Sequence, residues 1–447
     1  MDEPVNPQEL QAQLTAKQLL LALAQKEPKV QDKYDYFNAD NGVHDFGISV
    51  PKKMVNTRPG IGWASRAVNT IADRVVFEGF AGDTFGINDY FDSIQASKVI
   101  NNAKHDAFIA GCAFVAVVDS AEEDSDQKLL VPFTAQEATG VVDQTTGLLK
   151  MGLVVSRWSL PADKRRRQIF MPADYILFMP EYTATFKNGI LCDISENPTK
   201  RCLLHVLTHR NSADRPLGKS RITNTVRRIV QEVARVKRRY EIAGEFYSTP
   251  QRYINGLAEG AKKDDSMDSA IGKVWAITKD EDGDKPDIGQ LAQMTINQFS
   301  DNKKDLARDF CAETALTLRN LGYETGNPAG AESLKAMSDD LLLEAQTSQV
   351  EMGEQIKQIA ITLRLAVDEN SNIPVQLKNI VPAWKPIFQI DIGAAGDAMF
   401  KLFEVMPELS GSVTAYRMLG IGIREAEQLA AKRAKLASSS FMQQGGN

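Results

Sequence analysis

The feature of this sequence that most constrains its fold is a regular apolar stripe in the segment 222–247. Apolar residues recur there at alternating four- and three-residue steps, which is the heptad-like spacing of a long helix that packs along one side. The stripe contains Ile222, Val226, Ile229, Val233, Val236, Tyr240, Ala243 and Tyr247. Because Pro250 cannot continue a helix, the stripe predicts one long helix that ends before it.

A second long helix is predicted over residues 293–318, with Phe299, Leu306 and Phe310 on its apolar face. The polar segment between the two helices, 248–292, would form a small module at their far end. A pair of helices buries too little apolar surface to be stable alone, so this pair needs partners. The simplest partners are identical pairs from other copies of the chain, arranged in a ring.

Two groups of side chains on these helices are predicted to join neighbouring copies. The apolar group, which would pack between subunits, contains Val226, Ile229, Val233, Val236, Tyr240, Phe299, Leu306 and Phe310. The charged group, which would form ion pairs between subunits, contains Arg227, Arg228, Arg235, Arg238 and Arg239. The acids expected to pair with it are Asp301, Asp305 and Asp309 on the second helix.

The remainder of the chain predicts a mixed α/β protein with several domains. Its length of 447 residues, at roughly 150 residues per domain, agrees with that. Helical patterns cover Pro7–Gln25, Trp63–Phe77, Asp89–Ala110, Ala331–Val367, Ala394–Val405 and Arg424–Ala437. The residues expected to end the first three helices are Pro28, Gly79 and Gly111.

Three further segments have their own predictions. The residues Tyr34–Pro51 are rich in Asn, Asp, Gly and Tyr, so they predict an irregular loop. The apolar run Cys112–Val118 predicts a buried strand. Short apolar and β-branched runs separated by turn residues over 129–209 predict an antiparallel sheet.

Composition argues against several classes of protein. Lys and Arg total 52 against 58 Asp and Glu, a net charge of −6, so a basic coat for nucleic acid is not expected. No run of about 18 apolar residues occurs, which predicts no membrane-spanning helix. Four cysteines without a close pair fit a reducing compartment and small core positions. They are Cys112, Cys192, Cys202 and Cys311.

The segment from Lys200 to Phe246 departs from this acidic balance, with twelve basic and four acidic residues. One interpretation is a solvated or ion-paired helix face. The other is a positive belt beside a polyanion. The two are compatible if copies of the helix surround an axis.

Motifs for catalysis or metal binding are incomplete. Pro216–Ser220 (PLGKS) precedes a helix like a phosphate-binding loop, but Ala213 stands where the first glycine of that motif belongs. Asp280–Asp284 has the acidic spacing of a calcium loop, but Lys285 replaces its glycine. The pair His205 and His209 lacks further zinc ligands nearby. The sequence therefore predicts no catalytic, cofactor or metal site.

Several short segments occur in the order found in one known family. They are Arg66–Asn69 through Phe80, Ala107–Val115, His209–Ile222, Pro250–Gly256 and Leu321–Glu332. In this order and spacing they resemble the portal, or head-to-tail connector, proteins of tailed bacteriophages over residues 60–400. The resemblance implies a wing (1–220 and 333–410), a two-helix stem (221–247 and 293–319), a clip (248–292), a tunnel loop (320–332) and a short crown-like helix and tail (411–447).

The resemblance also implies a function. Portal subunits form a ring, usually of twelve, at one capsid vertex, and a terminase motor packages double-stranded DNA through it. The ring later joins head to tail and conducts the DNA on ejection. The implied partners are further copies of the chain, double-stranded DNA, the terminase large subunit, a head-completion or adaptor protein, and the major capsid and scaffolding proteins. The implied location is the virion, after assembly in the host cytoplasm, and neither enzymatic activity nor a cofactor is implied.

Two sets of site residues follow from the resemblance. The channel residues would be Arg319, Asn320, Tyr323, Asn327 and Lys335, in and beside a tunnel loop with no Lys or Arg between 320 and 330. Weak contact suits a loop that touches a moving duplex, because strong cationic rings would hold DNA. The clip residues for docking partners would be Lys262, Lys263, Asp280, Glu281 and Asp282.

Two alternatives to this function remain open on the sequence. The GKS triplet favours a P-loop enzyme that acts on nucleic acid. The acidic pI of about 5.5 favours a capsid or tail structural protein that never contacts DNA.

Overall fold

The chain forms two compact units. The computed structural model describes residues 7–44, 58–120, 127–159, 171–247, 252–255, 287–290, 296–323, 339–387 and 392–444. Unit 1 comprises Met1–Asn38, Ala64–Thr223 and Thr325–Asn447, and unit 2 comprises Ala39–Trp63 and Asn224–Glu324. Within the described ranges, no helix has the length and apolar character needed to cross a bilayer.

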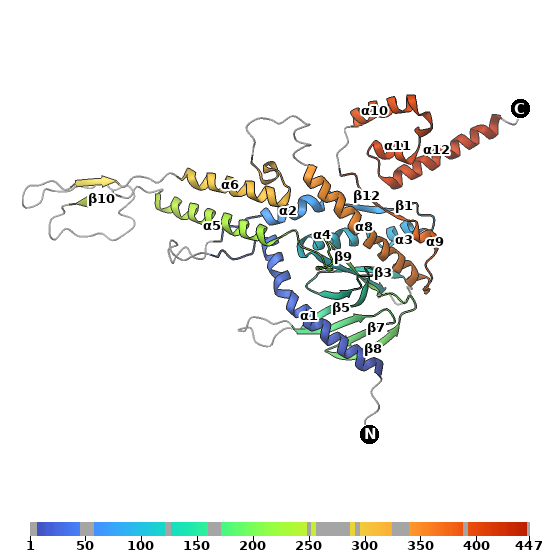
Figure 1. Ribbon diagram of the computed structural model, residues 1–447, viewed down its shortest axis with the longest axis horizontal. Helices are drawn as coiled ribbons and strands as arrows, with labels where there is room; N and C mark the ends of the chain where they lie inside the picture. Colours follow the sequence, from blue (N-terminus) through green and yellow to red (C-terminus); the bar gives the residue numbers. More distant parts are fainter. Residues whose placement is uncertain are drawn as a thin grey trace, which may run out of the picture. The chain divides into compact units, whose positions relative to one another are not determined.

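Two antiparallel sheets lie at the centre of unit 1 (Figure 1). The smaller has the order β3-β2-β9, with strands Lys128–Phe133, Cys112–Asp119 and Leu204–Thr208. The larger runs in chain order through β4 (Ala138–Val142), β5 (Leu149–Ser159), β6 (Met171–Phe178), β7 (Tyr182–Lys187) and β8 (Ile190–Glu196). The antiparallel sheet and the buried strand predicted from the sequence are both confirmed.

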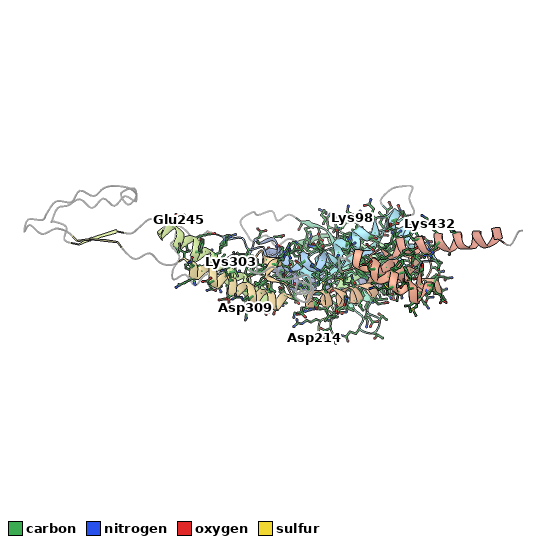
Figure 2. All side chains as sticks on the ribbon, turned by 90° about the horizontal axis from the view of Figure 1, so that it is seen from above. Lys98, Asp214, Glu245, Lys303, Asp309 and Lys432 are labelled. Atoms are coloured by element: carbon green, nitrogen blue, oxygen red, sulfur yellow. The ribbon has the colours of Figure 1, made fainter. Side chains whose placement is uncertain are left out.

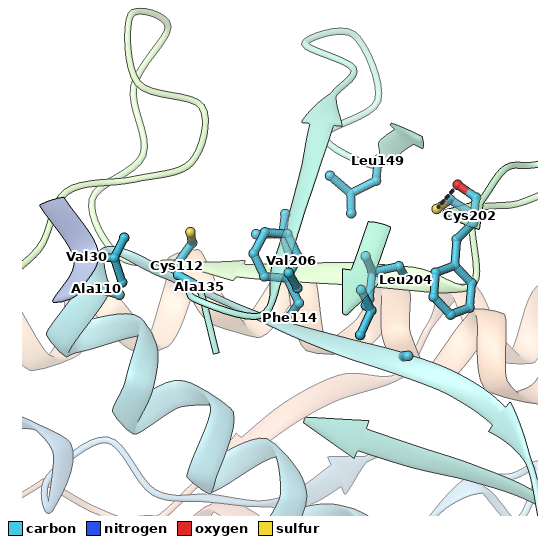
Figure 3. Packing of buried hydrophobic residues seen from close by; sticks show 13 residues of the cluster. Val30, Ala110, Cys112, Phe114, Ala135, Leu149, Cys202, Leu204 and Val206 are labelled. Carbon is cyan, nitrogen blue, oxygen red and sulfur yellow. Dashed lines mark hydrogen bonds between the residues drawn. The ribbon is translucent and has the colours of Figure 1, made fainter. Parts of the chain in front are cut away.

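Side chains from both sheets share one core, shown in Figure 3. Phe114 of β2 and Leu204 of β9 are fully buried there and share the cluster with Leu149 of β5. The Cys202 thiol donates a hydrogen bond to the Phe178 carbonyl at 3.6 Å, and burial raises its pKa to about 12. Cys202 is therefore the inert core residue that its type predicts.

The N-terminal helix is longer than the sequence predicts. Helix α1 spans Pro7–Asn38 and continues through Pro28, the residue expected to end it. Contacts with the rest of unit 1 hold its second half, since the Tyr34 hydroxyl donates to Asp106 at 3.2 Å. Such contacts offset the backbone hydrogen bond that a proline removes. The irregular segment consequently begins at Ala39.

The helix predicted over Trp63–Phe77 ends earlier. Helix α2 covers Trp63–Ala72, and the next residues turn into strand β1, Phe77–Ala81. This strand pairs antiparallel with β12, Val381–Trp384. Because the pairing partner lies far along the chain, a local pattern could not reveal it.

The helix predicted over Asp89–Ala110 is divided in two. Helix α3 spans Ile87–Ser93 and α4 spans Ala96–Ala110. Between them Gln95 adopts a left-handed conformation with φ of 53°, which breaks the helix. Gly111, with φ of 102°, ends α4 as predicted.

Helix α8, Asp339–Val367, lies against the smaller sheet and against β12. It matches the predicted helix Ala331–Val367, whose first eight positions, 331–338, lie outside the described residues. The chain then continues through α9 (Val375–Lys378), β12, α10 (Ile392–Val405), η4 (Pro407–Leu409), α11 (Val413–Met418) and α12 (Ile423–Gln444).

Unit 2 is built on two helices joined by a small segment. Helix α5 spans Asn224–Tyr247 and packs against α6, Asn297–Thr314. Two short strands, β10 (Arg252–Asn255) and β11 (Asp287–Gln290), lie between α5 and α6 in the sequence and pair antiparallel with each other. The short helix η3 (Leu318–Leu321) follows α6. The structure therefore has two helices at the two positions that the apolar stripes predict.

A buried lysine in unit 1 should make stability depend on pH. Lys104 of α4 donates hydrogen bonds to the carbonyls of Ala72 and Val75 at the end of α2, and burial lowers its pKa from 10.5 to about 8. Between these two values the unfolded chain binds more protons, so the free energy of unfolding should rise with pH by up to about 1.4 kcal/mol per pH unit.

The variant Lys104→Met should lose this slope, measured by denaturant unfolding across that pH range. The matched control is Lys98→Met, because Lys98 is an exposed lysine of the same helix. Equal slopes in wild type and Lys104→Met would contradict the assignment.

Candidate functional site

The apolar stripe of α5 is already buried within a single chain. Val226 and Val233 have no exposed surface, and neither has Phe310 of α6. The Trp63 and Phe310 rings lie 5.3 Å apart between centroids. Within the single chain, the buried members of the apolar group therefore have little or no surface left for the predicted packing between subunits. They are Val226, Ile229, Val233, Val236 and Phe310.

The physical reason is that unit 2 supplies partners that the two stripes alone do not reveal. The Gln231 side chain of α5 donates to the Gly42 carbonyl at 2.7 Å and accepts from the His44 backbone N–H at 3.0 Å. The segment 39–44 is thus fastened along α5. A sequence signal for this contact was a glutamine that falls on the buried side of the stripe.

Three members of the apolar group keep exposed surface. Tyr240 is 48% exposed, and Phe299 and Leu306 are more accessible than the buried seam. The Tyr240 and Phe299 rings lie 6.4 Å apart between centroids, edge to face. These side chains remain candidates for contact with another copy.

The five arginines of α5 do not share one face. Arg238 is 3% exposed, and Arg227 and Arg235 are half-buried. Only Arg228 and Arg239 of this set are exposed. The charged group predicted to pair between subunits is therefore divided, and Arg238 has too little surface to pair with another subunit in this conformation.

Helix α6 exposes a row of acids at four-residue spacing. Asp301, Asp305 and Asp309 are all exposed, and Figure 2 shows Asp309 on the outside of this helix. Lys304 lies 3.6 Å from Asp301 in the same helix. Exposed pairs of this kind contribute little stability, so these carboxylates are free to exchange such neighbours for arginines of another copy.

Three of the predicted channel residues lie just after α6. Arg319 in η3 is exposed, and the Tyr323 ring lies 6.0 Å from the Lys303 ammonium. Asn320 is half-buried. Asn327 and Lys335 lie outside the described residues, as do the clip residues Lys262, Lys263, Asp280, Glu281 and Asp282.

The GKS segment uses its backbone donors within the protein. The Gly218 N–H donates to Arg215 at 2.9 Å, the Lys219 N–H to His209 at 2.7 Å and the Arg221 N–H to Phe108 at 3.0 Å. A phosphate-binding loop needs such donors to converge on its ligand.

The glycine of this segment has a structural role. Gly218 has φ of 73°, and a Cβ there would overlap the carbonyl oxygens of Gly111 and His209. The segment is therefore a packed turn before α5, and its geometry does not favour the P-loop alternative.

The histidines and cysteines do not gather into a metal site. Among the described residues, no group of three or more His, Cys, Asp or Glu side chains could hold an ion. His205 is buried, and desolvation lowers its pKa to about 3, so it is neutral. Cys192 on β8 is exposed, contrary to the prediction of a core position, because β8 is an edge strand with both faces largely solvated.

A buried ion cluster in unit 1 was missed by the sequence analysis. Glu344 of α8 pairs with Arg221, and the two side chains are only 9% and 4% exposed. Arg210 lies 2.9 Å from the same carboxylate, and Arg221 also donates to the Ala67 carbonyl at 2.6 Å. The available signal was an acid within the buried stripe of α8, between Leu341 and Ser348.

The whole sequence was also compared with known proteins. No family model matches the chain. The portal proteins of Mycobacterium phages L5 and D29 are each 20% identical to it, over 435 and 431 residues. Both alignments cover 92% of this chain and 86% of the relative. The chain is a relative of bacteriophage portal proteins.

Solved structures with a related backbone come from gene transfer agent particles. The neck of the native particle, computed with C12 symmetry, aligns with a TM-score of 0.42 at 12% identity, covering 88% of this chain and 99% of the other. A chain of the native virion gives the same values. A TM-score this low reflects only loose agreement of the backbones. These structures therefore assign no role to any residue of this chain.

Proposed function

We propose that this protein is a phage portal subunit that forms a ring at one vertex of the capsid. Double-stranded DNA would be packaged through the ring by a terminase motor, and the ring would afterwards connect head and tail and conduct the DNA on ejection. The observation that carries the proposal is the alignment with two portal proteins over 92% of the chain. The protein would work in the virion without catalysis.

The structure supports an assignment of parts. Helices α5 and α6 would be the stem, the segment 248–292 the clip, and 320–332 the tunnel loop. Unit 1 would then contain the wing, and its last helices the short crown-like tail. The small strands β10 and β11 lie at either end of the proposed clip.

The charge of the proposed stem suits a conduit. Both signs of charge are exposed on it, with Arg228 and Arg239 on α5 and the aspartates on α6. Such a surface neutralises few phosphates, so a duplex could slide past it without tight, salt-dependent binding. Terminase and an adaptor protein would dock at the clip, and capsid and scaffolding proteins at the wing.

Charge reversal beside the tunnel loop should impair packaging. We expect Arg319→Glu combined with Lys335→Glu to lower the amount of packaged DNA several-fold, because like charge would repel the phosphates. The measurement is nuclease-protected DNA in a packaging reaction with assembled procapsids. The control is Lys98→Glu, which changes an exposed lysine of unit 1.

The packaging assay and an ATP-hydrolysis assay together separate the remaining alternatives. Rings by negative-stain electron microscopy together with unchanged packaging in the double variant would favour a structural protein that never contacts DNA. ATP hydrolysis by the purified protein that is lost in Lys219→Ala would instead favour an enzyme.

A further inference from the structure

Unit 1 contains an acidic cavity beside β9, the edge strand of its smaller sheet. The cavity has a volume of about 320 Å³ and lies between residues 146–149, strand β9 and helix α8. Two carboxylates of α8, Glu351 and Glu354, line it. None of the described residues that line it is a lysine or an arginine. The charge of its walls therefore favours a positively charged occupant.

The two carboxylates have no cationic partner within the described part of the chain. Glu351 accepts the Arg210 backbone N–H at 3.1 Å, and Glu354 accepts the Gln358 side-chain amide at 2.9 Å. Both donors are neutral groups, and the ion pairs between described residues include neither acid. Since a carboxylate accepts several hydrogen bonds, each acid can still accept a stronger, charge-assisted one.

A buried histidine adds a third group with unused bonding capacity. His205 of β9 lines the same cavity and is only 5% exposed. Its Nε2 atom has no hydrogen-bond partner among the described residues. A guanidinium carries five N–H donors in one plane, so a single arginine can bond to several such acceptors at once. The cavity therefore suits an arginine side chain.

The walls of the cavity are held in place by the protein itself. Gln355 of α8 accepts the Thr208 N–H at 2.8 Å and donates to the Thr208 hydroxyl at 2.6 Å. Gln358 accepts the Arg201 guanidinium at 2.6 Å. These bonds join α8 to β9 and to the residues just before it, so an occupant would enter a preformed site at little cost in ordering.

One segment of the chain has the matching charge. Lys164, Arg165, Arg166 and Arg167 form the longest run of basic residues in the sequence, here called the basic run. The run belongs to the segment 160–170, which lies between β5 and β6 and outside the described residues. Asp163 is the one acid of that segment. The basic run can therefore supply the arginine.

The basic run and the cavity belong to opposite ends of β5. Leu149 at the start of the strand lines the cavity, and Ser159 at its end leads into the segment 160–170. Ten residue steps of about 3.3 Å separate the two ends, or about 33 Å. Arg165 is six residues from Ser159 and six from Met171, so its backbone extends at most about 21 Å from them. The segment therefore falls short of the cavity of its own chain, which favours the cavity of another copy.

We propose that Glu351 and Glu354 in this cavity bind an arginine of the basic run from an adjacent copy of the chain. Each copy would offer the basic run at one end of β5 and the cavity at the other. Such a contact is heterologous, and heterologous contacts build rings when the rotation between copies closes. The inference rests on the proposed function and names one contact that stabilises the ring.

Charge reversal tests each side of the contact. The run-reversed protein carries Arg165→Glu and Arg166→Glu, and the cavity-reversed protein carries Glu351→Arg and Glu354→Arg. Each protein alone should assemble about tenfold or more weakly than wild type, because like charges would meet at every contact. Analytical ultracentrifugation measures assembly. The matched control, Lys17→Glu with Lys29→Glu, reverses two exposed lysines of α1 and should assemble as wild type.

Mixing the two reversed proteins in equal amounts distinguishes a contact between copies from one within a copy. In a ring of alternating copies, each reversed run would meet a reversed cavity and each native run a native cavity. Assembly should therefore recover in the mixture. Recovery only in a single chain that carries all four substitutions would place the contact within one copy and overturn the inference.

A crosslink tests the contact without any substitution. A carbodiimide joins a lysine amine to a carboxylate that it contacts, so Lys164 should become linked to Glu351 or Glu354. In rings assembled from isotope-labelled and unlabelled copies, mass spectrometry should find linked peptides that contain both labels. This measurement also decides the question if circular dichroism shows that the cavity-reversed protein is unfolded, and linked peptides of one label only would overturn the inference.

The remaining outcomes separate this inference from the proposed function. Run-reversed rings as stable as those of wild type would overturn the contact and leave the portal function standing. If those rings packaged less DNA, the basic run would be assigned to DNA instead. Absence of rings in the wild-type protein would overturn both the contact and the proposed function.

Discussion

Replacing Glu344 with alanine is expected to lower the free energy of unfolding by about 3–5 kcal/mol. The carboxylate is the partner of Arg221, whose side chain is only 4% exposed, and it also lies 2.9 Å from Arg210. Without it the buried guanidinium would keep its charge but lose its compensating anion. Denaturant unfolding followed by circular dichroism measures the effect.

Two further variants make this prediction specific. Glu354→Ala removes an exposed acid from the same helix and should change stability by less than about 0.5 kcal/mol. The double variant Glu344→Leu with Arg221→Met should recover most of the loss, because apolar residues of similar volume often replace a buried ion pair at little cost. A double variant as unstable as Glu344→Ala would show that the charge is not the cause.

Val233→Asp is expected to unfold unit 2, with a loss of about 4 kcal/mol or more. Val233 has no exposed surface within the single chain, so the new carboxylate would be buried without a partner. The sequence alone, which places this residue between subunits, would predict a stable monomer that fails to assemble. The structure predicts that the monomer itself is damaged.

Limited proteolysis distinguishes these outcomes, since an unfolded unit 2 exposes α5 to cleavage. Thr225→Asp is the matched control, because Thr225 is exposed in the first turn of the same helix, where a negative charge is favourable. A folded, protease-resistant Val233→Asp monomer that does not form rings would restore the original assignment of the seam.

The strongest local patterns in the sequence predicted the corresponding elements well. The stripe that contains Val226 and Val233 marks α5 almost to its ends, and the apolar run Cys112–Val118 is β2. In the first case apolar residues recur with a helical period over several turns, and in the second a short unbroken apolar run follows a glycine, so local sequence decides both structures.

Predictions failed where distant parts of the chain decide the structure. Strand β1 forms because Phe77–Ala81 finds β12, some three hundred residues later, and α1 passes Pro28 because Tyr34 and its neighbours are held by α4. The ion pair between Glu344 and Arg221 was not predicted because its two residues are also far apart in the sequence. Each partner looks like an ordinary charged residue until the fold brings them together.

The candidate site was predicted in outline rather than in detail. The two helices of unit 2 were predicted, but which of their side chains face outward depends in part on the segment 39–44 bound by Gln231, which has no periodic pattern. Outward Leu14 and Val350, by contrast, belong to helices whose inner faces are also apolar. A two-sided apolar helix does not reveal from sequence which side its own chain will cover.

The exposure of Cys192 has a practical consequence for counting subunits. The other three cysteines are buried or partly covered, so a maleimide fluorophore should react first at this edge-strand thiol. Each assembled particle would then carry one dye per polypeptide. Stepwise photobleaching of single particles would give the stoichiometry without any engineered label.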